Sequence, residues 1–215
     1  VNVQVGLFRL EIVDFTLKVF QEALLNALAH RDYQNQGSVY VKHYPDKVVI
    51  ENPGGFPEGI TQNNIITHPS VPRNKLIAET LQRLKYVQRT GQGVDIIYRD
   101  MVSSGKPYPE YRSYNDAVSL TMYSGIDDIE FVKFIAEEQN LRQRNFSLAE
   151  LMILRFLMDN RRISLSVAMN LVQGTRDIAQ KSLNNLTKEQ LIEVTGREYM
   201  LTARMYDAVK STVEY

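Results

Sequence analysis

The stretch Gln21–Tyr33, QEALLNALAHRDY, decides how the N-terminal part of the chain folds. Its small and aliphatic residues predict a mostly buried segment, within one helix that runs from about residue 14 to about residue 31. Glu22, Asn26 and His30 recur every four residues, so they share one face of that helix. Asn is a mediocre helix former, and a buried amide needs partners for both of its ends. A polar stripe on such a helix is therefore either solvated or part of a site.

The composition is that of an ordinary globular chain, with 215 residues of which 44% are hydrophobic and 23% charged. This length suggests one large domain or two modest ones. The absence of Cys excludes disulfides and thiolate nucleophiles, and it fits a reducing compartment, so we expect a cytoplasmic protein. No apolar run approaches a membrane span, and no signal-peptide layout is present. Because the chain begins with Val1 and not Met, we expect it to be part of a longer protein.

Two β-rich runs, Ser38–Tyr44 (SVYVKHY) and Lys47–Asn52 (KVVIEN), flank the dipeptide Pro45-Asp46. Two such runs around a Pro-Asp turn predict a β-hairpin. The second run leads into the loop ENPGGFP at residues 51–57, which is rich in residues that permit unusual backbone geometry. Taken alone, such a loop is most simply interpreted as a turn.

A further helix is expected from Arg73 to about Lys85, and the pair Gly91-x-Gly93 opens another that stops at Gly105. The N-terminus of a helix presents unpaired N–H groups, which suit a phosphate group. Taken alone, however, the glycines are more simply explained by close packing at the start of a helix. The alternating run Ala117–Tyr123 predicts a closing strand.

The order of these features resembles the GHKL nucleotide-binding fold of type II topoisomerase, chaperone, mismatch-repair and histidine-kinase ATPases. The resemblance implies that Asn26 holds Mg²⁺ on the phosphates of ATP or another adenine nucleotide, and that Glu22 is the candidate general base. Three segments are also similar in sequence to the C-terminal half of proteins labelled RecG-related ATP-dependent helicases or transcriptional regulators. They are EALLNALAHRDY, VVIENPGGFPEGIT and PRNKLIAETLQRLKYVQRTGQGVDII.

The chain departs from the family pattern at the box that reads the base. Glu51 stands where the family has an Asp that bonds the adenine amino group, and Pro53 replaces the first Gly of the box. Glu is one methylene longer, so it accepts the same hydrogen bond only if the loop shifts, and Asn52 is the alternative. Arg73 lies in the segment that forms a lid over nucleotide in the family and is a candidate phosphate contact. The cofactor-binding set implied by the resemblance is Asn26, Glu51, Asn52, Gly55, Arg73, Gly91 and Gly93.

The helicase label can be tested on the sequence itself. A helicase motor needs a Walker A loop, G-x-x-x-x-G-K-[ST]. The segment Gly105-Lys106-Pro107 has neither the leading Gly nor the Ser or Thr. The chain is therefore not a helicase motor by itself, and the residues leave open whether it is a weak ATPase.

The C-terminal part has the element order of a winged helix. Ser147-x-x-Glu150 is a capping box that opens the first of three helices, and a two-strand hairpin with a turn at Gly196-Arg197 follows the third. Thr175 is expected to cap the third helix, and its buried face is expected to hold Ile178, Ser182, Leu183 and Leu186. The residues expected to contact DNA are Arg176, Gln180, Lys181, Asn184 and Lys188 on that helix, and Arg197 on the hairpin. Residues 140–215 carry a net charge of only +3, so protein contact or dimerisation is the alternative use of this module.

Together these patterns predict an α+β protein. A GHKL-like (Bergerat) α/β sandwich is expected at residues 1–125, a connecting helix and linker at 126–146, and a winged-helix domain at 147–215. The function expected is that of a transcriptional regulator whose first domain binds nucleotide and whose second binds DNA, with a last helix at 204–213 offering a homodimer contact. The alternative is an ATPase with a conformational cycle whose winged helix contacts proteins. No membrane partner is expected.

Overall fold

The computed structural model describes residues 1–5, 8–86, 92–114 and 116–211. The chain divides into two compact units. Unit 1 consists of Val1–Ile12, Val102–Gly105 and Asp127–Tyr215, and unit 2 consists of Val13–Met101 and Lys106–Ile126. The predicted first domain started at residue 1, whereas the first twelve residues pack within unit 1.

Unit 2 contains a four-stranded sheet in which all neighbouring strands are antiparallel and the order is β3-β4-β6-β5. Its strands are β3 (Tyr40–His43), β4 (Lys47–Pro53), β5 (Glu110–Tyr114) and β6 (Ala117–Tyr123). The predicted hairpin and closing strand are confirmed. The edge strand β5 was not predicted, because its sequence EYRSY is polar and three of its five residues are exposed.

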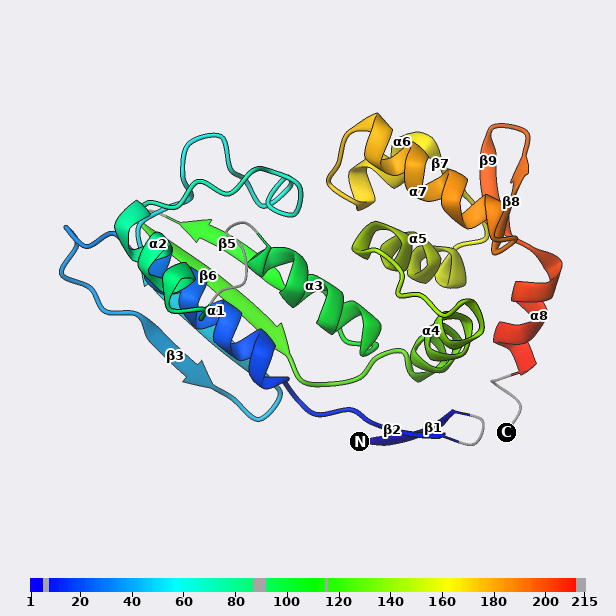
Figure 1. Cartoon of the computed structure of the whole chain (residues 1–215), viewed down its shortest axis with the longest axis horizontal. Coiled ribbons are helices and arrows are strands. Elements are labelled where there is room, and N and C mark those ends of the chain that lie inside the picture. The colour runs from blue at the N-terminus through cyan, green and yellow to red at the C-terminus, as the bar shows by residue number, and fades with distance from the viewer. Residues whose placement is uncertain (6–7, 87–91, 115, 212–215) are drawn as a thin grey trace. The chain divides into compact units, whose positions relative to one another are not determined.

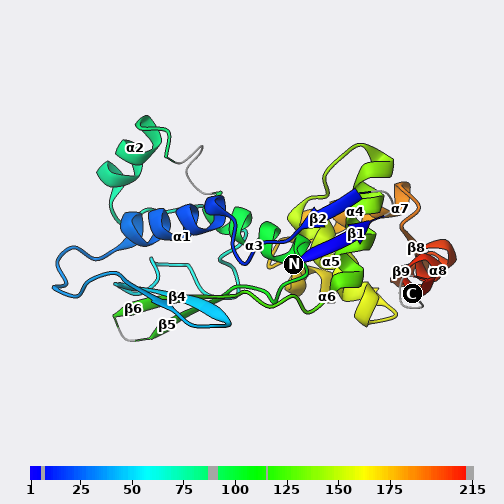
Figure 2. The ribbon, with the colours of Figure 1, turned by 90° about the horizontal axis from the view of Figure 1, so that it is seen from below.

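Helices α1 (Leu17–His30) and α3 (Gly93–Ser103) lie on one face of this sheet, as Figures 1 and 2 show. The small side chains of Ala23 and Ala27 are buried in the core against β4 and β6, so α1 can lie close to the sheet. Leu28, one of the aliphatic residues of the segment that was predicted to be mostly buried, is 39% exposed.

Asn74, the residue before helix α2 (Lys75–Arg83), is bonded to the end of α1. The Asn74 side-chain amide donates to the backbone oxygens of Ala29 and Arg31, at 3.1 and 2.7 Å. Those oxygens lie at the C-terminal end of α1, where carbonyl groups lack helical partners. Asn74 therefore satisfies the end of α1 and makes no side-chain cap bond to its own helix.

Unit 1 is built mainly from helices, with two small antiparallel sheets. Its helices are α4 (Ile129–Arg142), α5 (Leu148–Asp159), α6 (Leu165–Leu171), α7 (Arg176–Lys188) and α8 (Ala203–Ser211). Its strands are β1 (Asn2–Val5), β2 (Phe8–Glu11), β7 (Ile163–Ser164), β8 (Ile192–Thr195) and β9 (Glu198–Leu201). Both units combine helices with antiparallel sheets, so the α+β class is confirmed.

The local signals in unit 1 are largely confirmed. Ser147 and Glu150 form the predicted capping box at the start of α5, and Thr175 caps α7 through the backbone N–H of Ile178. Within residues 126–146, where a connecting helix and a linker were predicted, α4 extends from Ile129 to Arg142 and leaves only a short link to α5. The Arg142 guanidinium pairs with Glu138 one turn earlier in α4, which supports that last turn. Among the described helices, none is both long and apolar enough to cross a membrane.

Candidate functional site

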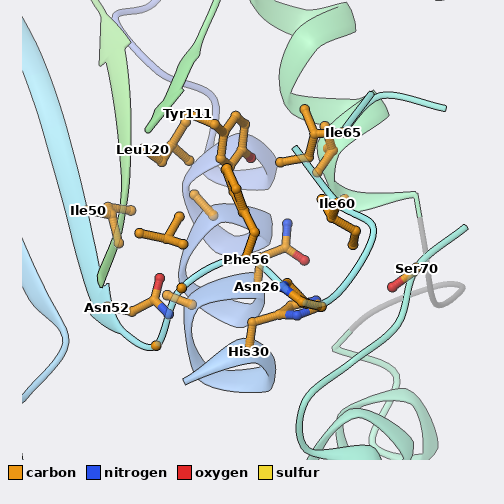
Figure 3. A pocket seen from close by; sticks show the side chains of 18 of the residues that line it. Asn26, His30, Ile50, Asn52, Phe56, Ile60, Ile65, Ser70, Tyr111 and Leu120 are labelled. Atoms are coloured by element: carbon orange, nitrogen blue, oxygen red, sulfur yellow. The ribbon is translucent and has the colours of Figure 1, made fainter. Parts of the chain in front are cut away.

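A cavity of about 110 Å³ opens in unit 2 between α1, the sheet, the loop after β4 and the first turn of α3 (Figure 3). Of the described residues that line it, none is an Asp, Glu, Lys or Arg. Its polar side chains are Asn26, His30, Asn52, His68, Ser70 and Tyr111, and the remaining lining is apolar or glycine. The part of a ligand that enters this cavity would therefore be met by neutral hydrogen-bonding groups.

Asn26 projects from α1 into the cavity and meets the first residue of α3. Its amide nitrogen is buried and has no hydrogen-bond partner among the described residues. A Cβ atom at Gly93 would lie 2.5 Å from that nitrogen and 2.9 Å from the amide oxygen, so a side chain there would push the amide out of its present position. The amide nitrogen therefore lies next to the first residue of α3 without a hydrogen-bond partner among the described residues.

The loop after β4 brings glycines and Asn52 to the same cavity. Asn52 is buried and lines the cavity, and its amide nitrogen donates to the Pro53 oxygen at 3.3 Å. Gly54 has a φ of +99°, and its N–H donates to the Asp116 oxygen at 2.5 Å. Because L side chains rarely adopt this φ, the turn depends on glycine at this position. Gly54 and Gly55 both line the cavity.

Glu51 does not lie in the cavity. Side chains alternate between the faces of a strand, so Glu51 points away from the face that carries Asn52. Its carboxylate pairs with Lys42 on β3, with 2.7 Å between nitrogen and oxygen. Of the two residues considered at sequence level for contact with the base, the structure brings only Asn52 to the cavity.

Arg73, proposed as a phosphate contact, is exposed and is not among the described residues that line the cavity. Its guanidinium donates to the backbone oxygen of His30 at 3.2 Å and to that of Gly55 at 2.9 Å. Arg73 thus holds the end of α1 against the glycine loop. Gly91, the first glycine of the predicted Gly-x-Gly pair, lies outside the described residues.

The three polar residues of the α1 stripe have different surroundings. Glu22 is 6% exposed and does not line the cavity, and its carboxylate forms no hydrogen bond with another described residue. Burial raises the pKa of its carboxyl, and Lys18 one turn earlier opposes this shift. His30 lines the cavity, and its pKa is lowered by burial and, secondarily, by the charge of Arg73.

Tyr111 on β5 is a cavity residue that sequence reasoning missed. Its hydroxyl is buried and has no hydrogen-bond partner in the described part of the chain, and its ring stacks on that of Tyr98 with 6.3 Å between centroids. Burial raises the pKa of Tyr111 well above the usual range of a phenol, and it raises the pKa of Tyr98 to about 12. The only sequence signal was an aromatic residue in a polar run, which does not indicate a strand or a site.

The residues predicted to contact DNA lie on α7 and at the β8–β9 turn of unit 1. Exposed members are Arg176, Lys181, Asn184, Lys188 and Arg197. Gln180 is half-buried, and its amide nitrogen donates to the Asn184 side chain and to the Tyr199 hydroxyl, each at 2.9 Å. Ile178, predicted to be buried, is 39% exposed, because the buried stripe of α7 is Ala179, Ser182, Leu183 and Leu186.

In the described part of the chain, no three His, Cys, Asp or Glu side chains are grouped so that they could hold a metal ion by themselves. A cation at Asn26 would therefore depend on oxygens supplied by a ligand. Mg²⁺ is commonly bound in this manner, with substrate phosphates completing its coordination.

Residues 36–122 match the family model described as "Putative ATP-dependent DNA helicase recG C-terminal". This region is an ATPase-like domain related to the RecG C-terminus. The matched residues contain β3, β4, the glycine loop and α3, so the ATPase-like domain supplies most of the cavity, and α1 precedes it.

No curated protein matches the chain. Its fold is similar to that of the DIP2311 protein from Corynebacterium diphtheriae, whose crystal structure superimposes with a TM-score of 0.83 at 21% identity. The likeness covers 98% of this chain and 44% of that one, so the chain spans less than half the length of DIP2311.

Proposed function

We propose that unit 2 binds ATP or another adenine nucleotide, together with Mg²⁺, with the base side of the ligand in the cavity. The observation that carries this proposal is the unpartnered Asn26 amide, packed against Gly93 at the N-terminus of α3. A buried amide without a partner is costly, so such a group is typical of a site that a ligand completes. The ATPase-like match of residues 36–122 supports the same ligand class.

The residues present fit this ligand in two respects. Gly93 lines the cavity at the start of an 11-residue helix, whose first N–H groups and positive dipole end favour phosphate. The Asn26 amide oxygen is a neutral ligand for Mg²⁺, which would neutralise charge on the phosphates. Asn52 would meet the base through an amide that can both donate and accept.

Unit 1 is proposed to be a winged helix that binds DNA through α7. The exposed surface of α7 offers Arg176, Lys181 and Lys188, with Asp177 as its acidic residue in the described structure. Such cations suit phosphate contacts, and Asn184 suits a base edge. The combined proposal is a transcriptional regulator in which nucleotide occupancy of unit 2 controls DNA binding by unit 1.

A second candidate function is ATP hydrolysis that drives a conformational cycle. Glu22 favours it, because a buried carboxyl with a raised pKa, one turn before Asn26, has the character of a general base. This function requires Glu22 to reach a water at the ligand, although it does not line the cavity. Under this candidate, Glu22→Gln removes turnover and spares nucleotide binding.

Calorimetry with Mg-ATP and Mg-ADP tests the nucleotide proposal. Wild-type protein should release or absorb heat on binding, and Asn26→Ala should abolish it. Asn170→Ala is a matched control, because Asn170 is an exposed asparagine on α6 and lies outside the cavity. Absence of binding to the wild-type protein would refute the nucleotide proposal.

The DNA proposal is tested by the salt dependence of binding to a duplex of mixed sequence. The double variant Arg176→Ala/Lys181→Ala should weaken binding and reduce the slope of log K against log salt by about 1.8, since each lost phosphate contact removes about 0.9. The control is Lys75→Ala/Arg83→Ala, which removes two exposed cations from α2 of unit 2. An unchanged affinity and slope in the α7 variant would refute DNA binding through this helix.

A further inference from the structure

The Tyr111 hydroxyl is the second unpartnered polar group in the cavity. Among the described residues, the buried side-chain atoms without a hydrogen bond include only two from cavity residues, the Asn26 amide nitrogen and the Tyr111 oxygen. Buried tyrosine hydroxyls usually find a hydrogen-bond partner, because an unpaired hydroxyl away from water is costly. The cavity thus lacks one hydrogen bond at Tyr111 in addition to the one at Asn26.

The position of Tyr111 is set by the sheet and not by a flexible loop. It pairs with Leu120 of β6, and Figure 3 shows the two residues together at one end of the cavity. Its neighbours Glu110 and Arg112 alternate to the other face, where they pair with each other at 2.8 Å. Tyr98 stacks on the ring from α3. A phenol held in this way is preorganised, so a ligand that meets it loses little entropy in ordering it.

The chemistry of the cavity restricts what can meet this hydroxyl. The described lining has no charged Asp, Glu, Lys or Arg side chain, and the phenol remains protonated at neutral pH because burial raises its pKa. The group available is therefore an O–H donor beside apolar side chains such as Leu120 and Ile65. Its complement is a flat, uncharged ring that carries an acceptor nitrogen or oxygen.

We propose that Tyr111 is a ligand-contacting residue whose hydroxyl donates to an acceptor atom on the uncharged heterocycle of the bound ligand. This inference rests on the proposed nucleotide function and assigns recognition of the base to Tyr111 together with Asn52, with Glu51 excluded by its position on the other face of β4. The phenol of Tyr111 and the amide of Asn52 would thus recognise the base in place of the carboxylate of the family motif. The ligand class is a purine nucleoside or nucleotide, read through ring acceptors.

The test compares Tyr111→Phe with Tyr98→Phe by calorimetry, using Mg-ATP and adenosine as probes. Each variant removes one phenol oxygen from the same stacked pair, but Tyr98 is not among the described residues lining the cavity. Tyr111→Phe should bind both probes about 5- to 30-fold more weakly, the loss expected for one neutral hydrogen bond in a dry site. Tyr98→Phe should bind both as the wild type does.

A melting curve of the ligand-free proteins separates this role from a structural one. Tyr111→Phe should melt no lower than the wild type, because its hydroxyl has no partner to lose. A wild-type affinity in Tyr111→Phe, or a clearly lower melting temperature without ligand, would overturn the inference while leaving nucleotide binding intact. Failure of the wild-type protein to bind either probe would instead overturn the proposed function, and the inference with it.

Discussion

Replacing Gly93 with Ala changes one hydrogen into a methyl group at the point where α1 meets α3. The added Cβ would lie 2.5 Å from the Asn26 amide nitrogen, 2.9 Å from its oxygen and 3.0 Å from Cγ. These separations are below any normal van der Waals contact, so the amide must move away from the start of α3. The backbone itself tolerates alanine, since Gly93 has no left-handed φ.

The cost of this move should appear in binding and not in stability. The unpaired Asn26 nitrogen loses no hydrogen bond when it moves, and an off-rotamer side chain costs about 0.5–1.5 kcal/mol. Alanine in place of glycine stabilises by about 0.4–1 kcal/mol through the unfolded state, so the two effects nearly cancel. A lost hydrogen bond to a charged ligand group costs about 1.5–3 kcal/mol, which corresponds to about 10- to 150-fold weaker Mg-ATP binding.

The Gly93→Ala single variant is measured by calorimetry with Mg-ATP, and a double-mutant cycle with Asn26→Ala is measured by urea unfolding. In the Asn26→Ala background the methyl group has no amide to displace, so Gly93→Ala should stabilise the fold by about 0.4–1 kcal/mol. The reasoning would be refuted by wild-type affinity in the Gly93→Ala single variant. It would also be refuted by equal effects of Gly93→Ala on stability in both backgrounds.

Three further predictions concern stability. Gly105→Ala should lower the free energy of unfolding in urea by about 2–4 kcal/mol, because the φ of Gly105 is +67° and an added Cβ would meet the Asp128 backbone oxygen at 2.4 Å. The control Gly125→Ala should be nearly neutral, because Gly125 has open space around it. Glu22→Gln should raise the melting temperature at pH 7, and this gain should shrink as the pH falls toward 4.5, because burial raises the pKa of Glu22 and its charged form opposes folding. Glu150→Gln should lower the melting temperature at pH 7. Burial raises the pKa of Glu150, but its bonds with Arg144 and the Ser147 backbone outweigh burial and lower that pKa, so the charged form stabilises the fold. The loss in melting temperature should therefore shrink once the pH falls below 4.5. Equal pH profiles for the two Gln variants would contradict both assignments.

The helix that carries Asn26 shows how far sequence reasoning could reach. The periodicity of Gln21–Tyr33 predicted a helix with Asn26 and His30 on one face, and both line the cavity. Periodicity could not reveal that Glu22, on the same stripe, is buried outside the described cavity lining. The stripe runs the length of the helix, and which of its turns faces a cavity depends on segments far away in the chain.

Base recognition shows a different limit. Alignment to a family motif placed Glu51 at the base, whereas the pairing of β4 with β6 turns Asn52 toward the cavity and Glu51 toward Lys42. A shift of one residue along a strand exchanges its two faces, so a small misalignment reverses the conclusion. Tyr111 was missed for a related reason, because a site contributed by a polar edge strand carries no local pattern.

The amino-acid sequence by itself determined the features whose causes are local: the helix that contains Asn26, the hairpin around Pro45-Asp46, the capping box at Ser147 and Glu150, and the glycine that begins α3. Their signals lie within one or two turns of the residues concerned, so they can be interpreted without the rest of the chain. Only the tertiary structure decided which polar groups are left without partners. That property depends on the burial of Asn26 and Tyr111 by residues distant in sequence, and it is what makes the cavity a candidate binding site.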